Sequence, residues 1–308
     1  MNDGAADIEV DRDALARVAR LRSRFRGALL GLAVGEAAAA PALYGRPGGF
    51  APVRDLLGGG PLDLPRGAWA AHSALALASA HSLLATGRSD PEDQRARWRR
   101  WQQHGEGSAT GECLGISASV ARALVEDRPD PAFADGADAL TRVAPFALRF
   151  LGDPDAMRHA VRASAAITSH RTETADAASA FADMMREALR GADPATILAA
   201  GGHAAAPRLS YASPADGSLS EARPVAALAV VAGAFAAGSG WKDTVLRAVN
   251  LGGPADAFGA LCGQLAGAHH GVEAIPAAWL AALAQRAQIE DLADALLAEV
   301  LVGLAEAA

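Results

Sequence analysis

A carboxylate at the end of a glycine-spaced helix is the first feature of this sequence that suggests a site. Gly27, Gly31 and Gly35 recur every four residues, so they share one face of a predicted helix, and Glu36 follows directly. Glycines at this spacing allow a second helix to approach closely, and the same approach would bring the Glu36 carboxylate to a cleft. Because an unpaired buried charge is unfavourable, we expect Glu36 to have polar partners there.

A second candidate segment combines small hydroxyl side chains with glycines. Ser108, Thr110 and Gly111 stand just before a predicted helix over 112–126. The free backbone N–H groups and the dipole at a helix start favour an anion such as a phosphate. The segment therefore indicates a phosphate-binding loop.

The paired histidines and the two cysteines do not form a metal-binding or redox pattern. His269 and His270 are adjacent, and adjacent helical side chains point about 100° apart, so they rarely bind one ion together. We assign them to a helix end before Gly271. Cys113 and Cys262 belong to no CxxC pair, and we interpret both as small buried apolar residues rather than nucleophiles.

The elements that must position these residues are predicted to be helices. Of 308 residues, 51% are hydrophobic and 20% are charged, which is ordinary for a globular protein, whereas only 5% are aromatic. Alanine, which is abundant here, has the highest intrinsic helix propensity, and period-two runs of Val, Ile and Thr are nearly absent. The sequence therefore predicts an all-α fold.

Asp-Pro pairs mark several of the helix starts, because Asp caps the first turn and Pro at the first helical position loses no needed donor. These pairs are Asp90-Pro91, Asp130-Pro131, Asp153-Pro154 and Asp193-Pro194. One long helix or two abutting ones are expected over 11–39. Further helices are expected over 91–103, 112–126, 154–169, 173–190, 222–238, 241–250, 255–271, 276–286 and 289–306, and another begins near Trp69. Residues 40–67, rich in Pro and Gly, are expected to be a loop. No linker separates two units, so we predict a flexible tail over 1–10 and one domain over 11–308.

The net charge and the hydropathy of the sequence limit the kinds of partner that the protein is expected to bind. The formal net charge of −7 disfavours nucleic acid and anionic membranes. The basic cluster 95–101 is interpreted as a solvated helix face with Trp98 and Trp101 packed inward; a phosphate-binding strip is the alternative. The longest apolar run, 225–237, is too short to span a bilayer, and the N-terminus carries no signal-peptide pattern. We expect a cytoplasmic protein.

Between Arg24 and about Leu283 the chain resembles the ADP-ribosylglycohydrolase family. The family's opening pattern, R-x-x-G-x-L-x-G-x-A-x-G-D-A, is matched from Arg24, except that Glu36 stands in place of Asp. The W-T-D-D-T pattern of the family aligns with residues 69–73, which read Trp-Ala-Ala-His-Ser. Its S-x-T-G, M-R-x-A-P-L-A, T-H and N-L-G-G-D-x-D-T-N patterns align with residues 108–111, 141–147, 169–170 and 250–258.

The resemblance implies a single compact helical domain that, in active members, holds two Mg²⁺ ions. These ions clamp the ribose of an ADP-ribosyl group and activate water, so that the glycosidic bond to a modified side chain is cut. The resemblance also implies ligand-binding roles for Ser73, Ser108, Thr110, Gly111, Arg142 and His170.

The sequence departs from the family where the ions would bind. Positions 70, 71 and 257 are alanine, position 254 is proline, and His72 offers a nitrogen that suits Mg²⁺ poorly. Only Asp256 stands as in the family pattern, while Ser73 and Glu36 are altered versions. One Asp, one Ser and one Glu do not neutralise two divalent cations. We therefore predict no metal site and no magnesium cofactor.

Three hypotheses follow. In the first, the chain is a pseudoenzyme whose cleft binds ADP-ribose, a nucleotide-like small molecule or an ADP-ribosylated protein. In the second, Glu36, His72 and Asp256 form a rebuilt metal-independent acid–base site that acts on an N-glycosidic or ribosyl substrate; a mononuclear transition-metal site on the same residues is a variant. In the third, the role is structural, without a ligand.

Overall fold

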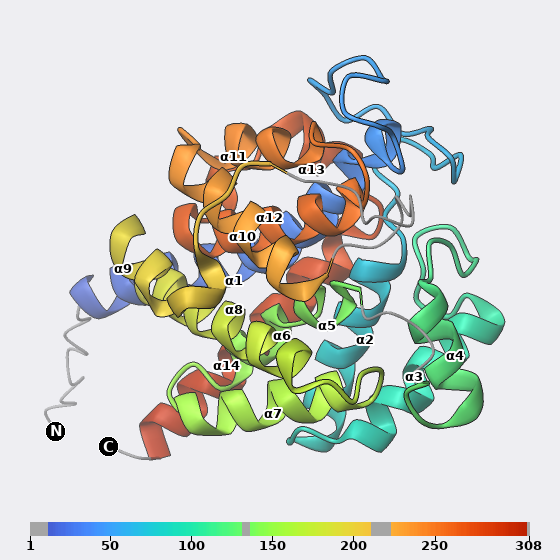
Figure 1. The fold of residues 1–308 in the computed structure, drawn as a ribbon. Coiled ribbons are helices and arrows are strands. Elements are labelled where there is room, and N and C mark those ends of the chain that lie inside the picture. The colour runs from blue at the N-terminus through green and yellow to red at the C-terminus, as the bar shows by residue number, and fades with distance from the viewer. Residues whose placement is uncertain (1–11, 131–135, 211–222, 307–308) are drawn as a thin grey trace, which may run out of the picture.

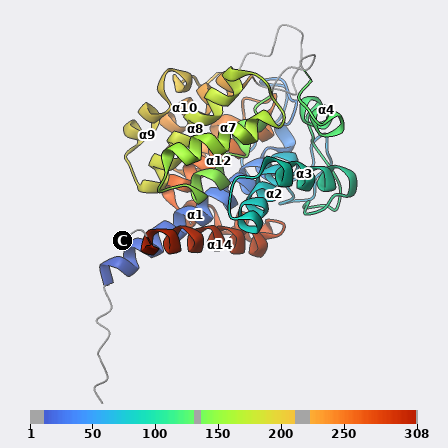
Figure 2. The same ribbon diagram turned by 90° about the horizontal axis from the view of Figure 1, so that it is seen from below.

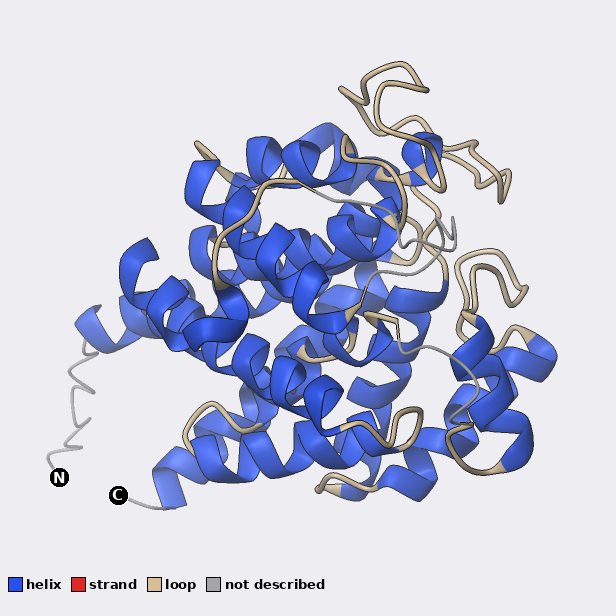
Figure 3. Cartoon of the chain, viewed as in Figure 1, coloured by secondary structure: helices blue, strands red, loops and turns tan. Residues whose placement is uncertain are grey.

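Helices make up the regular structure throughout residues 12–130, 136–210 and 223–306, which are the residues that the computed structural model describes (Figures 1 and 3). Within these ranges, strand-type pairing is limited to one isolated antiparallel bridge between Gly59 and Leu64. The predicted all-α fold is therefore confirmed. The predicted tail over 1–10 lies outside the described residues.

The centre of the molecule is a pair of long helices, α1 (Arg12–Ala38) and α12 (Ala255–His270), with the other helices arranged around them (Figure 1). Helix α14 runs beside α1 (Figure 2), where Asp294 accepts hydrogen bonds from Arg22 and Arg26. The surrounding helices are α2 (Ala71–Thr86), α3 (Pro91–His104), α4 (Ala118–Glu126), α5 (Asp138–Thr141), α6 (Ala144–Arg149), α7 (Pro154–Ala166), α8 (Thr172–Arg190), α9 (Pro194–Ala200), α10 (Pro224–Ala237), α11 (Trp241–Val249), α13 (Ala277–Ala282) and α14 (Arg286–Glu306), with 3₁₀ turns η1 (Ala40–Ala42), η2 (Gly202–Ala205) and η3 (Val272–Ala274).

Six glycines bring α1 and α12 into backbone contact. They form the pairs Gly27–Gly267, Gly31–Gly263 and Gly35–Gly259, which we call the glycine seam. A Cβ added on the α1 side would lie only 2.0–2.3 Å from a carbonyl oxygen of α12. No side chain fits at such a distance, so the spacing of four that predicted a close helix contact is confirmed.

The Asp-Pro starts are confirmed wherever the structure describes the whole pair. Asp90, Asp153 and Asp193 each accept backbone N–H groups from the first turns of α3, α7 and α9. For the fourth pair, Pro131 lies outside the described residues. Helices α5 and α6 were not predicted, because each is shorter than two turns and gives little periodic signal.

Two predicted helix boundaries are wrong. The helix expected over 112–126 begins only at Ala118, because Gly111 and Gly115 adopt left-handed backbone angles (φ +82° and +71°) and Ser117 supplies the cap. The helix expected over 276–286 ends at Ala282, and α14 begins at Arg286, after Gln285 at φ +55°.

The basic cluster 95–101 is a solvated face of α3, as predicted. Trp98 and Trp101 are buried, while the four arginines of the cluster pair with Asp93, Glu106 and Asp127. The histidine pair ends α12 before Gly271, also as predicted. In the part of the chain that the structure describes, the helices are too short or too polar to cross a bilayer.

Candidate functional site

The starts of helices α2, α4, α5 and α12 meet around a small cavity. Its volume is about 170 Å³. We call it the His72 cavity, and it is lined by Tyr44, His72, Gly115, Ile116, Ser117, Ala118, Gly136, Ala137, Asp138, Pro254, Asp256 and Ala257. Two of the three predicted catalytic residues, His72 and Asp256, therefore face the same space.

Glu36, the third predicted catalytic residue, lies behind this cavity and caps a helix. The first turn of α2 has no side-chain cap of its own. Glu36 replaces it: one carboxylate oxygen accepts the His72 N–H (3.0 Å), and the other accepts the Ser73 N–H (2.8 Å) and hydroxyl (2.5 Å). An anion satisfies the free donors at a helix start and favours the helix dipole. Glu36 thus has the polar partners that its burial demands, but it is not among the residues that line the cavity.

The His72 ring is held from both sides. Its Nδ1 lies 3.1 Å from the Thr141 hydroxyl oxygen and 3.9 Å from Oδ1 of Asp138. On the other side, Nε2 lies 3.5 Å from Oδ2 of Asp256. The Thr141 hydroxyl donates its proton to the Asp138 carbonyl oxygen, so its oxygen accepts the Nδ1 proton. His72 is 7% exposed and lines the cavity.

The carboxylates around His72 decide its charge. Burial alone would lower the pKa of His72, but Asp256, Glu36 and Asp138 outweigh that effect and raise the pKa to about 9. The ring is therefore an imidazolium at neutral pH. Burial also raises the pKa of Glu36, although the His72 charge and the hydrogen bonds from Ser73 act in the opposite direction.

Sequence reasoning missed Asp138 and Thr141. Asp138 is buried, accepts a hydrogen bond from the Ser117 hydroxyl (3.0 Å) and stands one helical turn before Thr141. Gln264 of α12 holds this turn in place by donating to the Thr141 carbonyl oxygen and accepting the Ala144 N–H. The available signal was their position, because Thr141 is the first residue of the segment 141–147 that resembles the family pattern and Asp138 lies three residues before it.

Ser108, Thr110 and Gly111 do not line the His72 cavity. The Ser108 carbonyl oxygen accepts a hydrogen bond from Gln285 of the loop before α14, and the Thr110 hydroxyl accepts the Glu112 N–H. No helix starts at residue 112, so the loop lacks the helix start and the dipole that were expected to favour an anion there. The helix start at the cavity is six residues later, at Ala118.

Arg142 and His170 also lie away from the cavity. The Arg142 side chain is fully buried; it donates to Ser164 and Thr168, and its guanidinium lies 4.6 Å above the Trp98 ring. It is a buried cation that packs on Trp98 of α3 and donates to Ser164 of α7, and its predicted contact with a ligand stays a prediction. His170 is exposed in the loop before α8. Ser73 is buried beneath the cavity as a partner of Glu36.

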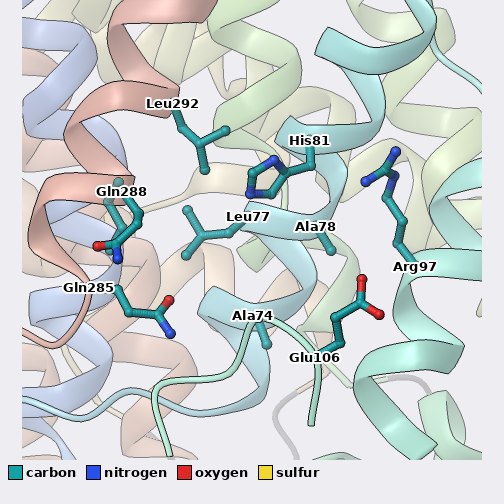
Figure 4. Close-up of a pocket in the computed structure, with 11 residues that line it drawn as sticks. Ala74, Leu77, Ala78, His81, Arg97, Glu106, Gln285, Gln288 and Leu292 are labelled. Carbon is teal, nitrogen blue, oxygen red and sulfur yellow. The ribbon is translucent and has the colours of Figure 1, made fainter. Parts of the chain in front are cut away.

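A second cavity lies along α2, farther from its start. It has a volume of about 380 Å³ between α2, α3 and α14 (Figure 4). His81, Arg97, Glu106 and Gln288 surround an apolar floor that includes Leu77 and Leu292 (Figure 4). We call it the His81 cavity. Arg97 and Glu106 already pair with Asp93 and Arg100, so the charges at its rim are satisfied within the protein.

Known proteins resemble this chain over nearly its whole length. The ADP-ribosylglycohydrolase family model matches residues 17–304. The ADP-ribosylarginine hydrolase Tri1 of Pseudomonas putida is 30% identical over 89% of this chain and 77% of its own length. The ADP-ribosyl-[dinitrogen reductase] glycohydrolase of Rhodospirillum rubrum is 32% identical over 92% of this chain and 98% of its own. A solved structure of an ADP-ribosylglycohydrolase-related protein complex superposes with a TM-score of 0.76 and 36% identity, covering 91% of this chain and 99% of that one.

Proposed function

The chain belongs to the ADP-ribosylglycohydrolase family, and we propose that it binds an ADP-ribosyl group in the His72 cavity without a resident dimagnesium centre. The observation that carries this proposal is the position of the His72 imidazolium between Asp138 and Asp256. The ligand class comes from the family and from the relatives, an ADP-ribosylarginine hydrolase and an ADP-ribosyl-[dinitrogen reductase] glycohydrolase.

The side chains around the cavity do not suit two Mg²⁺ ions. Magnesium prefers an octahedron of oxygens, usually carboxylates and water. Here Pro254 and Ala257 line the wall but have no side-chain atoms that could bind a metal ion. The Glu36 oxygens already accept hydrogen bonds from the start of α2. The cationic ring of His72 separates Asp138 from Asp256. Among the described residues, no three His, Cys, Asp or Glu side chains are grouped as a metal site.

The size and polarity of the cavity suit one sugar ring. A volume of about 170 Å³ is below the roughly 300–1,000 Å³ of sites that enclose drug-sized ligands. The ribosyl end would enter, while the adenosine diphosphate part would lie outside it. Asp138 and Asp256 provide carboxylate oxygens that can accept hydroxyl protons from the ribose.

A metal-independent enzyme is the second candidate, and the contact between His72 and Asp256 favours it. An imidazolium beside a carboxylate can donate a proton to the leaving group of a glycosidic bond. Because His72 is protonated at neutral pH, it would act as a general acid and not as a general base. Glu36 does not line the cavity, so a Glu36–Asp256 pair across the scissile bond is not supported by the geometry.

Calorimetric titration with ADP-ribose, once in EDTA and once in excess Mg²⁺, tests the proposal. We expect the same affinity in both buffers, and at least a tenfold loss in Asp256→Asn with no loss in the matched control His81→Ala. Binding that requires Mg²⁺, or no binding in either buffer, would refute the proposal. Release of ADP-ribose from ADP-ribosylarginine in EDTA, lost in His72→Gln, would instead establish the second candidate.

A further inference from the structure

We infer that Tyr44 is a ligand-contact residue of the His72 cavity, and that its side chain forms the apolar surface on which the sugar ring of the ligand packs. The inference rests on the proposed function and names the residue that contacts the sugar. The two can fail separately, because the wild type is the reference for every Tyr44 variant in the same titration.

The backbone of Tyr44 adopts a conformation that residues with large side chains rarely take. Its φ is +58°, in the left-handed region that glycine enters freely and other residues enter at a cost in free energy. Among the described residues other than glycine, Asp63, Asp127 and Gln285 also have a positive φ, and all three are polar. A strained residue persists where its surroundings impose the conformation, and such residues gather at binding sites. Tyr44 is therefore a candidate for a role other than stabilising the fold.

The loop before Pro254 imposes this conformation on Tyr44. The Tyr44 N–H donates to the Gly253 carbonyl oxygen (2.7 Å), and the Gly253 N–H donates to the Gly45 carbonyl oxygen (2.8 Å). Gly252 packs directly on Gly45, because a Cβ at Gly252 would lie only 2.3 Å from the Gly45 carbonyl oxygen. Two hydrogen bonds in opposite directions and a backbone contact thus fix Tyr44 beside the part of the cavity wall that Pro254 forms.

Tyr44 has the largest side chain among the described residues that line the His72 cavity, and it is partly exposed. Most of the other lining residues are small, as at Gly115 and Ala118, or charged, as at Asp138 and Asp256. A sugar ring has hydroxyl groups at its edge and C–H groups on its faces, so its site needs hydrogen-bond acceptors and an apolar surface. The two carboxylates provide the acceptors. An aromatic ring provides rigid apolar area at a low cost in conformational entropy, and a fixed backbone lowers that cost further.

Three substitutions at Tyr44 separate the effect of the ring from that of the backbone. Tyr44→Ala removes the ring and keeps the unfavourable conformation, Tyr44→Gly removes the ring and relieves the backbone, and Tyr44→Phe keeps the ring. In thermal unfolding, we expect the Tm of Tyr44→Gly to lie about 2 to 4 °C above that of Tyr44→Ala. In calorimetric titration with ADP-ribose, Tyr44→Ala and Tyr44→Gly should both bind about tenfold more weakly than wild type, and Tyr44→Phe should bind nearly as well. Glycine would then restore stability without restoring affinity, which a purely structural role of the side chain does not predict.

Asp63 supplies the matched control. It also has a positive φ, of +46°, but it is exposed in a turn and is not among the residues that line the cavity. Asp63→Gly should melt above Asp63→Ala by a similar margin, and both variants should bind ADP-ribose as wild type does. Wild-type affinity in Tyr44→Ala or Tyr44→Gly, or a Tyr44→Gly variant that is no more stable than Tyr44→Ala, would overturn the inference and leave the proposed function intact. A wild-type protein that binds no ADP-ribose would overturn both.

Discussion

The glycine seam and the His72 cavity lie at neighbouring points of the same two helices, yet different forces hold them. In the seam, α1 and α12 touch through backbone, and a single Cβ has no room. At the cavity, the same helices end or begin, and their side chains interact through charge: Glu36 follows the last seam glycine of α1, and Asp256 lies in the first turn of α12. The seam is therefore governed by shape, and the cavity by electrostatics.

This difference explains how the family framework can persist while residues of the cavity differ from the family pattern. A seam glycine admits no substitution without moving a helix, whereas a cavity position can exchange one charged or polar group for another if the sum of charges is kept. Relative to the family pattern, His72 exchanges one polar group for another, whereas Pro254 and Ala257 remove a polar side chain, and the chain still superposes on the family-related structure with a TM-score of 0.76.

The largest effect is expected in the seam. Gly31→Val would place a Cβ 2.2 Å from the Gly263 carbonyl oxygen and displace α12 from α1. Overpacking of this kind against backbone should cost more than about 4 kcal/mol. We expect the variant to be insoluble or to lack a cooperative transition by circular dichroism. The matched control is Gly303→Ala in α14, where no atom lies within 4 Å and Ala should be neutral or slightly stabilising. A folded Gly31→Val variant would show that the seam is adaptable.

The seam could be predicted from the sequence, whereas the cavity could be predicted only in part. Glycines that recur every four residues are a local pattern, and this pattern predicts which face of α1 is free of side chains even when the partner helix is unknown. The cavity and the helix cap behind it bring together residues 36, 72, 138 and 256, and their meeting depends on how four helices cross. His72 and Asp256 were found because they lie in segments that resemble the family, and Asp138 was missed because it lies just outside one.

The errors of the sequence analysis have the same origin. The segment 108–111 was expected at a helix start, but left-handed glycines delay α4 by six residues and leave the loop against Gln285. The burial of Arg142 over Trp98 likewise follows from packing between helices that no local pattern reveals, while its predicted contact with a ligand stays a prediction.

The next largest effect is a dependence of stability on pH that belongs to the cavity alone. The pKa of His72 is raised from about 6.5 in the unfolded chain to about 9 when folded, so its contribution is complete below pH 6.5 and is lost as the pH rises through 9. The shift corresponds to about 3 kcal/mol. Urea unfolding between pH 6.5 and 9.5 should show this decline in the free energy of unfolding. The charged groups that act on the ring are Asp256, Glu36 and Asp138.

His72→Gln should unfold at a lower urea concentration than wild type at every pH in this range, but its midpoint should depend much less on pH. Gly303→Ala, which is far from any titrating group of the cavity, should keep the wild-type slope. A His72→Gln variant with an unchanged slope would mean that another group titrates in this range, and the electrostatic account of the cavity would be wrong.

A smaller effect is expected where the two regions join. Glu36→Ala leaves the N–H groups of His72 and Ser73 without an acceptor at the start of α2, which should cost about 2 kcal/mol. Urea denaturation would measure it against Asp90→Ala, which removes the partly exposed cap of α3 and should cost about 1 kcal/mol. If both variants lose the same free energy of unfolding, burial adds nothing to the stabilisation that the Glu36 cap provides.

The smallest effect is expected in the His81 cavity, although it is the larger of the two hollows along α2. His81 is exposed at its rim, and burial together with the nearby Arg97 lowers its pKa, so it carries no charge that a buried anion depends on. His81→Ala should change the free energy of unfolding by less than about 0.5 kcal/mol and leave ADP-ribose binding unchanged. The result is informative because the larger volume favours the His81 cavity as the ligand site, whereas the buried charges favour the His72 cavity. If His81→Ala weakens ADP-ribose binding more than Asp256→Asn does, then the ligand follows volume, and the His72 cavity is an electrostatic support for the helix starts and not the binding site.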